Sequence, residues 1–531
     1  MKTLYHNAKV YTGTLPLAEC FAVEDGLFCF AGALADAPEC DETIDLQGKF
    51  VCPGFNDSHM HVVNFGQALS IAPLHMNTGS LAQMLDCLRR NLAEGKGLRG
   101  GWLLGRGWNQ DYFADEKRMP TRHDLDKVST EVPICAVRAC GHALTLNTKA
   151  IELIGIPNNP AQPDGGQIVL EDGVPNGIFL DNAMDPVYDA IPAPRKEELK
   201  DMIRTACRTL NGYGITSAQS DDYSSFATLS WQAVNEAYRE LEESDELTVR
   251  VNEQANFAHL PDFRDFVQHK PAGSEFFKIG PLKMLGDGAL GARTAFLSRP
   301  YADDPSTCGI PVFSQETFDE MIGYANEVGM NVAVHAIGDA CLDRVLSAIE
   351  KALDAHPRAD HRHGIVHCQI TRADQLEKMA KMGLHIYAQS IFLDYDIRIV
   401  ALRAGEALAS TSYSWKTLLN TGATVSNGSD CPVELPRVLP GIQCAVTRTC
   451  LDGSEPAYLP AEAFTVQEAI DSFTSGGAFA SFEENRKGKI QPGMLADFVV
   501  LGEDPFAVSP ETIGSIPVLA TYLGGKPVFT A

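Results

Sequence analysis

A pair of histidines after an apolar run is the feature that most constrains this chain. The run Phe50 to Cys52 leads through Pro53 and Gly54 to His59-Met60-His61. Alternate side chains of a β-strand point to the same side, so His59 and His61 would approach one metal ion together. Such a pair alone also fits a surface or core position, so its interpretation depends on the rest of the chain.

Four apolar, β-branched runs further along the chain also end in polar residues. They end at Lys283, His335, His367 and Asp430. Histidine or lysine in so apolar a run is unfavourable unless it is paired or ligated, so these residues indicate one shared site. Apolar residues at helical spacing fill the intervals, as in Phe318, Met321, Ile322 and Ala325. This alternation predicts an α/β chain with a TIM-like (β/α)8 barrel and its chemistry at the C-terminal ends of the strands.

We expect eight barrel strands. The first, second, third and seventh lie at about 50–57, 214–219, 247–254 and 384–389, and the fourth, fifth, sixth and eighth end at Lys283, His335, His367 and Asp430. About 140 residues then separate the first two strands, far more than a βα loop holds. The excess predicts an inserted subdomain at 66–190 that caps the pocket and sets specificity.

Both ends of the chain consist of short apolar runs separated by tight-turn residues. Phe21 to Val23 and Leu27 to Phe30 flank Glu24-Asp25-Gly26, a hairpin signal. The C-terminal runs 496–501, 518–523 and 526–529 have the same character. Since neither end is large enough to fold alone, we expect one small β-sandwich from 1–49 plus 486–531, with the barrel domain at 50–485.

The formal net charge of -26 argues against nucleic acid and anionic membranes as partners, because phosphates would be repelled. No apolar stretch reaches the roughly 18 residues that span a bilayer, and no secretory leader is visible. The 14 cysteines form no Cys-x-x-Cys pair, which fits a reduced cytoplasmic protein. A homodimer is the default expectation for the oligomeric state.

Short motifs run almost from end to end, in the order Pro53-Gly54-Phe55 through His61, Gly141-His142-Ala143 with Asn147, Gly214 to Ser217, Lys283 with Asp287 to Thr294, His335, His367, Ser429 to Val433, and Gly488 to Asp497. Together they resemble the amidohydrolase superfamily, specifically its family 3 (YtcJ-like) branch, which includes N-substituted formamide deformylases. The resemblance implies a metal-dependent hydrolase with a small-molecule substrate, on a TIM-like barrel with a β-sandwich built from both termini.

Imidazole and carboxylate donors suit zinc or a similar divalent ion. We expect His59, His61 and Asp430 to hold one ion, and His335 and His367 a second. A free amine at Lys283 could add carbon dioxide, and the resemblance supports an N6-carboxylated Lys283 that bridges two ions. The alternative is a salt-bridged Lys283 beside a single ion.

The resulting hypothesis is hydrolysis of an amide-like, non-peptide C–N bond by metal-activated water, with Asp430 as catalytic general base and acid. Alternatives are a deaminase or isomerase on the same site, or a non-catalytic scaffold derived from such an enzyme. A scaffold is disfavoured because all six candidate ligand positions hold competent residues.

Five residues are weaker candidates for substrate binding: Trp108, His142, Asp287, Arg293 and Gln389. Trp108 fits a core position as well as a pocket, and His142 fits a structural role equally well. We slightly favour an Asp287–Arg293 pair that stiffens its loop. Gln389 stands at a strand end, where it would reach substrate. His123, His356, His361 and His363 lack a supporting pattern, and we expect them to be solvated.

Overall fold

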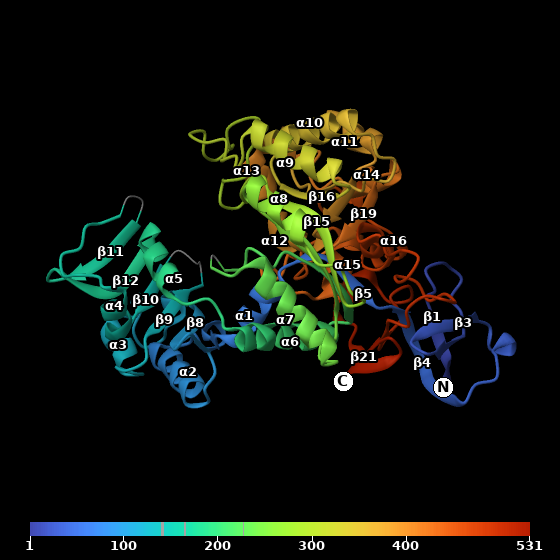
Figure 1. Ribbon diagram of the computed structural model, residues 1–531, viewed down its shortest axis with the longest axis horizontal. Helices are drawn as coiled ribbons and strands as arrows, with labels where there is room; N and C mark the ends of the chain where they lie inside the picture. Colours follow the sequence, from blue (N-terminus) through green and yellow to red (C-terminus); the bar gives the residue numbers. More distant parts are fainter. Residues whose placement is uncertain (140–142, 164–165, 227) are drawn as a thin grey trace. The chain divides into compact units, whose positions relative to one another are not determined.

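The computed structural model describes residues 1–139, 143–163, 166–226 and 228–531. The chain forms two compact units, coloured along the sequence in Figure 1. The first comprises Met1–Val62, Cys207–Ser224 and Glu242–Ala531, and the second comprises Val63–Ala206 and Ser225–Leu241. The domain boundaries that we expect from the sequence stay a prediction.

A parallel barrel sheet is the centre of the first unit. Across the described residues its eight strands are β5 (Phe55–Met60), β13 (Ile215–Ser220), β14 (Arg250–Asn256), β15 (Phe277–Leu285), β16 (Val332–Ala336), β17 (Gly364–His367), β18 (His385–Ala388) and β19 (Thr424–Asn427). Each strand pairs in parallel with the next in the chain. Just beyond β19, Asp430 N–H donates to His59 O and His61 N–H donates to Cys431 O, both at 2.8 Å, which brings the last strand against the first.

The expected first strand, 50–57, is wrong in its first half. Phe50 to Pro53 end β4 (Glu42–Pro53), which belongs to another sheet, and β5 begins at Phe55. Gly54 joins the two strands where a β-carbon would lie 2.2 Å from Thr216 Oγ1. A side chain would not fit there, so glycine lets the chain pass directly from one sheet into the other.

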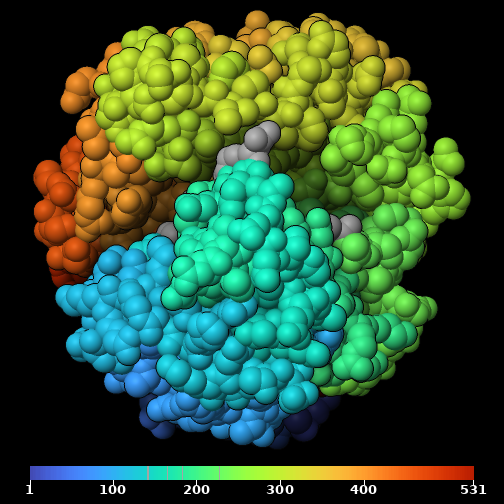
Figure 2. All heavy atoms as spheres, turned by 90° about the vertical axis from the view of Figure 1, so that its left-hand side faces the viewer, coloured from blue at the N-terminus to red at the C-terminus, as the bar shows by residue number. Residues whose placement is uncertain are grey.

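Helices connect the barrel strands from β14 onward: α8 (Leu260–His269), α9 (Gln315–Glu327), α10 (Asp339–Ala355), α11 (Ala373–Met382), α12 (Leu393–Asp396), α13 (Val400–Ala409) and α14 (Trp415–Asn420). Ser314 caps α9 by accepting from Thr317 N–H, and the apolar face predicted for this helix is buried. Atoms of α9 and α10, yellow-green to yellow, form a continuous outer surface in Figure 2. The expected strand–helix alternation is confirmed.

Both chain ends form one mixed sheet, which within the described chain has the order β22-β21-β20-β4-β1-β2-β3. Besides β4, its strands are β1 (Lys2–Val10), β2 (Cys20–Glu24), β3 (Leu27–Gly32), β20 (Phe498–Leu501), β21 (Val518–Leu523) and β22 (Lys526–Thr530). The rings of Phe28 and Phe498 lie 6.1 Å apart although three strands separate theirs. In a flat sheet they would be about 19 Å apart, so the sheet curls around a shared aromatic core.

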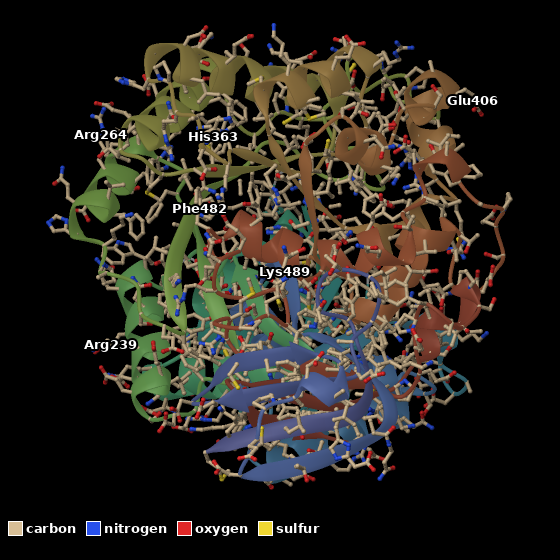
Figure 3. The ribbon with its side chains drawn as sticks, turned by 90° about the vertical axis from the view of Figure 1, so that its right-hand side faces the viewer. Arg239, Arg264, His363, Glu406, Phe482 and Lys489 are labelled. Atoms are coloured by element: carbon tan, nitrogen blue, oxygen red, sulfur yellow. The ribbon has the colours of Figure 1, made fainter. Side chains whose placement is uncertain are left out.

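Ion pairs join the segment after β19 to the N-terminal ends of the barrel strands. This segment contains α15 (Val438–Thr447), α16 (Val466–Ser472) and α17 (Ser475–Ala480). Arg250 at the start of β14 pairs with Asp497 at 2.8 Å, and Lys278 at the start of β15 pairs with Glu483. Arg362, just before β17, pairs with Glu484 at 2.7 Å and lies over the Phe482 ring, labelled in Figure 3.

The second unit holds a mixed sheet of its own. Its strands include β6 (Ala72–Pro73), β7 (Leu98–Arg99), β8 (Trp102–Trp108), β9 (Ile134–Arg138), β10 (Ala143–Leu146), β11 (Gly166–Glu171) and β12 (Val174–Asp181). Its helices include α1 (Val62–Ser70), α2 (Leu81–Ala93), α3 (Arg122–Asp126), α4 (Thr148–Ile154) and α5 (Asp185–Ala190). The sequence boundaries between the two units fall within α6 (Lys196–Gly212) and α7 (Trp231–Glu243). No helix of the described residues is long and apolar enough to cross a bilayer.

Candidate metal centre

The six predicted ligands lie around the C-terminal end of the barrel in the first unit. His59 and His61 come from the end of β5, Lys283 from β15, and His335 and His367 from the ends of β16 and β17. The His59 ring lies 5.4 Å from the His61 ring and 5.9 Å from the His367 ring, and the His367 and His335 rings are 4.4 Å apart, all between ring centroids. Strand ends separated by hundreds of residues thus meet.

His59, His61 and Asp430 are the tightest part of this cluster. Their candidate ligand atoms all lie within 4.8 Å of one another. Oδ1 of Asp430 is 3.4 Å from His59 Nε2 and 3.2 Å from His61 Nε2. The backbone of Asp430 is left-handed, with φ 55°, and so is that of His367, with φ 73°. Such conformations are unfavourable for residues with a β-carbon and often occur where a side chain must be aimed at a site.

The hydrogen bonds of His59 leave its Nε2 lone pair facing a carboxylate. Gln254 Nε2 donates to Ser58 O at 3.1 Å, which fixes the amide, so Gln254 Oε1 accepts from His59 Nδ1 at 2.6 Å. Burial, and then the charge of Lys283, hold the pKa of His59 well below its usual value, so the ring is neutral. Two acceptors, His59 Nε2 and Asp430 Oδ1, therefore face each other, and a cation between them would relieve their repulsion. This donor set fits a divalent metal.

His61 is oriented in the same way by the backbone. Its Nδ1 donates to Asp221 O at 2.9 Å, which directs Nε2 toward Asp430. Burial opposes protonation, but the hydrogen bond to Asp430 and the nearby Asp221 raise the pKa of His61 to about 9. A metal ion at this place would replace the proton on Nε2, since both compensate the same carboxylate.

His335 and His367 present one ring nitrogen each. Gln389 Nε2 donates to Tyr387 O at 2.9 Å, so Gln389 Oε1 accepts from His367 Nδ1 at 2.8 Å and Nε2 carries the lone pair. Burial lowers the pKa of His367 to about 3, so the ring is neutral. His335 Nε2 donates to Gly288 O at 3.2 Å, which leaves Nδ1 as its possible ligand atom.

Lys283 forms the salt bridge that the sequence left as an alternative. Its Nζ lies 3.6 Å from Asp221 Oδ2, and the two side chains are 3% and 2% exposed. The Asp221 carboxylate also accepts from Asn256 Nδ2 at 2.9 Å and from Ser224 Oγ at 3.0 Å. The Lys283 side chain thus lies beside an acidic group at the histidine cluster.

Two of the weaker candidates have other partners than expected. Arg293 does not pair with Asp287: its guanidinium makes a bidentate contact with Asp303 at 2.8 and 3.2 Å. The fully buried Asp287 carboxylate accepts from the backbone N–H groups of Phe296, Ile337 and Gly338. Its Oδ1 also lies 3.2 Å from His335 Nε2. These contacts favour a structural role for Asp287.

The other substrate-binding candidates lie away from solvent or outside the residues that the structure describes. Trp108 is fully buried in an apolar cluster and donates from Nε1 to Ala136 O at 2.9 Å, as the core alternative requires. Gln389 lies behind His367 and orients it. His142 lies outside the described residues. The expectation that His361 and His363 are solvated is wrong: both are buried, and His363 accepts from Val332 N–H at 3.2 Å.

Two contributors were missed by the sequence analysis. Gln254 lies on β14 and Asp221 directly follows β13, and neither interrupts an apolar run as a histidine or lysine does. The available signal was position: both stand at the C-terminal end of an expected or observed barrel strand, where side chains reach the site.

A model of the amidohydrolase family matches residues 42–529. This chain belongs to the amidohydrolase family. It is 33% identical to "Putative amidohydrolase YtcJ" of Bacillus subtilis (strain 168), over 100% of this chain and 99% of that protein. It is 25% identical to an N-substituted formamide deformylase of Arthrobacter pascens, over 92% of this chain and 90% of that protein.

Among solved structures, an uncharacterized metal-dependent hydrolase from Pyrococcus furiosus aligns with this amidohydrolase at a TM-score of 0.78 and 27% identity. The alignment covers 95% of this chain and 100% of that chain. The family and the fold class expected from the sequence are confirmed. Together with the His59–His61–Asp430 group, they support a metal-dependent hydrolase.

Proposed function

We propose that this amidohydrolase hydrolyses an amide-like, non-peptide C–N bond of a small molecule. The observation that carries the proposal is the buried approach of the neutral His59 Nε2 to Asp430 Oδ1 at 3.4 Å, with His61 Nε2 at 3.2 Å from the same oxygen. The approach of the two acceptors His59 Nε2 and Asp430 Oδ1 is unfavourable by itself, and a cation between them would make it favourable. The name of the Arthrobacter relative, a formamide deformylase, supports the C–N bond class.

His59, His61 and Asp430 would hold a first ion, and His335 Nδ1 with His367 Nε2 a second. Nitrogen and carboxylate donors in this number suit zinc. The ion supplies Lewis acidity toward a carbonyl oxygen and lowers the pKa of water. The protein's contribution is to aim the imidazoles, which Gln254, Gln389 and Asp221 O accomplish by accepting from the Nδ1 atoms of His59, His367 and His61. Burial keeps His59 and His367 neutral.

We propose Asp430 as the proton carrier. Burial opposes its ionisation, but the hydrogen bond with His61 and the neighbouring histidines hold the pKa of Asp430 well below its usual range. As a carboxylate it would accept a proton from water as the water oxygen bonds to the carbonyl carbon. It would then return that proton to the nitrogen as the C–N bond breaks.

Lys283 has two distinct forms under this proposal. As an ammonium it would stay paired with Asp221 beside one ion, and as an N6-carboxylate it would help to hold two. Counting metal ions per chain in Lys283→Met separates the forms. Loss of the second ion supports the carboxylate, whereas an unchanged count with lower thermal stability supports the ion pair, because Asp221 is then left buried without its partner.

The function is tested by screening N-formyl amines, N-acyl amino acids and cyclic amides with the zinc-loaded protein and with Asp430→Asn. We expect release of an amine by the parent protein and a 10²- to 10⁴-fold lower kcat in Asp430→Asn. Asp452→Asn, at an exposed surface carboxylate, is the matched control and should keep full activity. Equal activity in Asp430→Asn and the parent would contradict the proposed role.

A further inference from the structure

The barrel sheet of the first unit has a seam between its last and its first strand. Each of the other neighbouring strands pairs in a parallel ladder, but among the described residues no ladder joins β19 to β5. His59 lies on β5 and His61 directly follows it, while Asp430 lies just beyond β19. The three most tightly clustered candidate ligands therefore meet where the sheet has no ladder, and their spacing depends on other contacts.

The two sides of this seam approach each other closely. A β-carbon on Gly428 would lie 2.6 Å from the backbone nitrogen of His59 and 2.7 Å from Oδ1 of Asp57. Side chains do not tolerate contacts this short, so only glycine lets the chain just after β19 lie against β5 here. The backbone bond from Asp430 N–H to His59 O, at 2.8 Å, spans the same gap.

Asp57 is the side chain that bridges the seam. Each of its carboxylate oxygens accepts from Ser429 N–H at 3.1 Å, and Oδ2 also accepts from the Ser429 hydroxyl at 2.5 Å. On its own strand, Asp57 Oδ1 accepts from His59 N–H at 3.2 Å. The Asp57 side chain is fully buried, so water does not compete for these donors. Because Ser429 directly precedes Asp430, one carboxylate fixes the backbone beside two candidate ligands.

Asp430 is held from both directions along the chain. On one side stands Ser429 with its bonds to Asp57, and on the other Val433 N–H donates to Asp430 O at 2.8 Å. The left-handed backbone of Asp430, with φ 55°, persists only where such surrounding contacts hold it. Asp57 is not a member of the group of candidate ligand atoms, since its oxygens face backbone and hydroxyl donors. Its effect on a metal ion would therefore be exerted through the positions of His59 and Asp430.

We propose that Asp57 is a positioning residue that closes the barrel seam and thereby sets the separation of His59 and Asp430. The inference rests on the proposed function, because that function supplies the metal ion between these two ligands. Asp57 acts here as a hydrogen-bond acceptor, and its charge is not needed. An asparagine keeps one oxygen for both N–H groups, while its Nδ2 can donate to the Ser429 hydroxyl, which then acts as an acceptor. A leucine of similar shape keeps no acceptor and leaves both N–H groups buried without a partner.

The first measurement is amide hydrogen exchange of the metal-free full chain, followed by mass spectrometry. In Asp57→Leu we expect exchange about tenfold faster in the segments 55–61 and 427–433, because the lost bonds make local opening of the seam easier. Exchange on β16, the strand farthest from the seam, should stay as in the parent protein. In Asp57→Asn the exchange of all three segments should stay within about threefold of the parent. A loss of general stability alone would instead speed exchange everywhere.

The second measurement is zinc affinity, by competition with a chromogenic chelator. We expect Asp57→Leu to bind zinc about 10- to 100-fold more weakly than the parent, and Asp57→Asn to stay within about threefold. Asp339→Leu is the matched control, because Asp339 is equally buried and accepts from Ser298 N–H at 2.8 Å but lies outside the seam. Asp339→Leu should lower thermal stability and leave zinc affinity and exchange at the seam unchanged.

Parent-like exchange and zinc affinity in Asp57→Leu would overturn the inference. Equal losses in Asp57→Asn and Asp57→Leu would also overturn it, because the charge of Asp57 would then matter and not hydrogen-bond acceptance. A parent protein that binds no zinc contradicts the inference and the proposed function together. Zinc binding without any amide hydrolysis contradicts the proposed reaction alone.

A milder variant covers the case that Asp57→Leu is unfolded by circular dichroism. Ser429→Ala removes the hydroxyl bond to Asp57 and keeps the bonds from the backbone N–H. It should speed exchange of the segment 427–433 about threefold. Unchanged exchange there contradicts the inference.

Discussion

Gln254 Oε1 accepts a hydrogen bond from His59 Nδ1 at 2.6 Å, and this contact decides which nitrogen of His59 faces Asp430. The amide is itself fixed by donation to Ser58 O, one residue before His59 on β5. Gln389 repeats the arrangement at His367 by donating to Tyr387 O. Each glutamine thus sets the tautomer of one histidine through a backbone carbonyl.

Replacing Gln254 by leucine should weaken metal binding 10- to 100-fold, because His59 can then take the wrong tautomer. The measurement is zinc affinity by competition with a chromogenic chelator. Gln254→Glu is the informative partner variant, since a carboxylate still accepts from Nδ1. We expect Gln254→Glu to bind metal more tightly than Gln254→Leu, and equal affinities in the two variants would contradict the orienting role.

Removing the metal should lower the thermal stability of the protein. A ligand that binds the folded state at 1,000 times its dissociation constant adds about 4 kcal/mol to the free energy of unfolding. Thermal unfolding with and without chelator, followed by addition of zinc, measures the effect. His61→Ala should reduce the zinc-dependent difference, because one of the three clustered ligands is missing. An unchanged transition temperature after complete metal removal would rule out stabilising metal binding at this site.

Glu483 should make the protein sensitive to acid. Burial alone would raise its pKa, but Lys487 at 2.6 Å and Lys278 lower the pKa of Glu483 from 4.5 to about 2. The ionised form is favoured by folding, so the stabilisation is complete above pH 4.5 and is lost as pH falls from 4.5 toward 2. The shift corresponds to roughly 3 kcal/mol.

Glu483→Gln should therefore unfold more easily at pH 7 and show a flatter fall in stability below pH 4.5 than the parent. Urea unfolding at a series of pH values measures both effects. Glu39→Gln, at an exposed carboxylate, is the control and should follow the parent. Identical acid profiles for Glu483→Gln and the parent would show that the lysines do not hold this carboxylate ionised.

The Arg250–Asp497 pair should matter more than an exposed pair. Both side chains are about 95% buried, with exposures of 4% and 5%. Arg250→Met leaves Asp497 buried without its partner, which costs about 3–5 kcal/mol. The double variant Arg250→Met/Asp497→Leu should recover part of that loss. Lys9→Met, which removes the half-exposed Lys9 from Asp504, should change stability by less than about 1 kcal/mol in the same denaturation experiment.

The sequence predicted the barrel and the convergence of the six candidate ligands because these residues follow or end runs that are largely apolar. It could not separate β4 from β5, since Phe50 to Pro53 and Phe55 to Met60 are buried strands joined by Gly54. A break between two sheets depends on which strands lie alongside, and that information is not local.

The roles of the residues around the candidate ligands also could not be predicted from the sequence. Arg293 has Asp303 ten residues away as its partner and not Asp287 six residues away, because the loop between them folds back. Gln389 gains its role from His367 on the neighbouring strand β17, and Gln254 from His59 on β5, with β13 between them. Spacing along the chain predicts which side of a strand a residue occupies, but the neighbouring strand decides what it contacts.

The terminal sheet also constrains how the chain is made. Strands β20 to β22 are synthesised after every barrel strand, yet β20 pairs directly with β4 near the start of the chain. During synthesis the N-terminal strands keep the edge of β4 unpaired and part of their aromatic face uncovered until the final segment leaves the ribosome. A nonsense mutation just before Phe498 would thus leave all six candidate ligand side chains on a protein prone to aggregation.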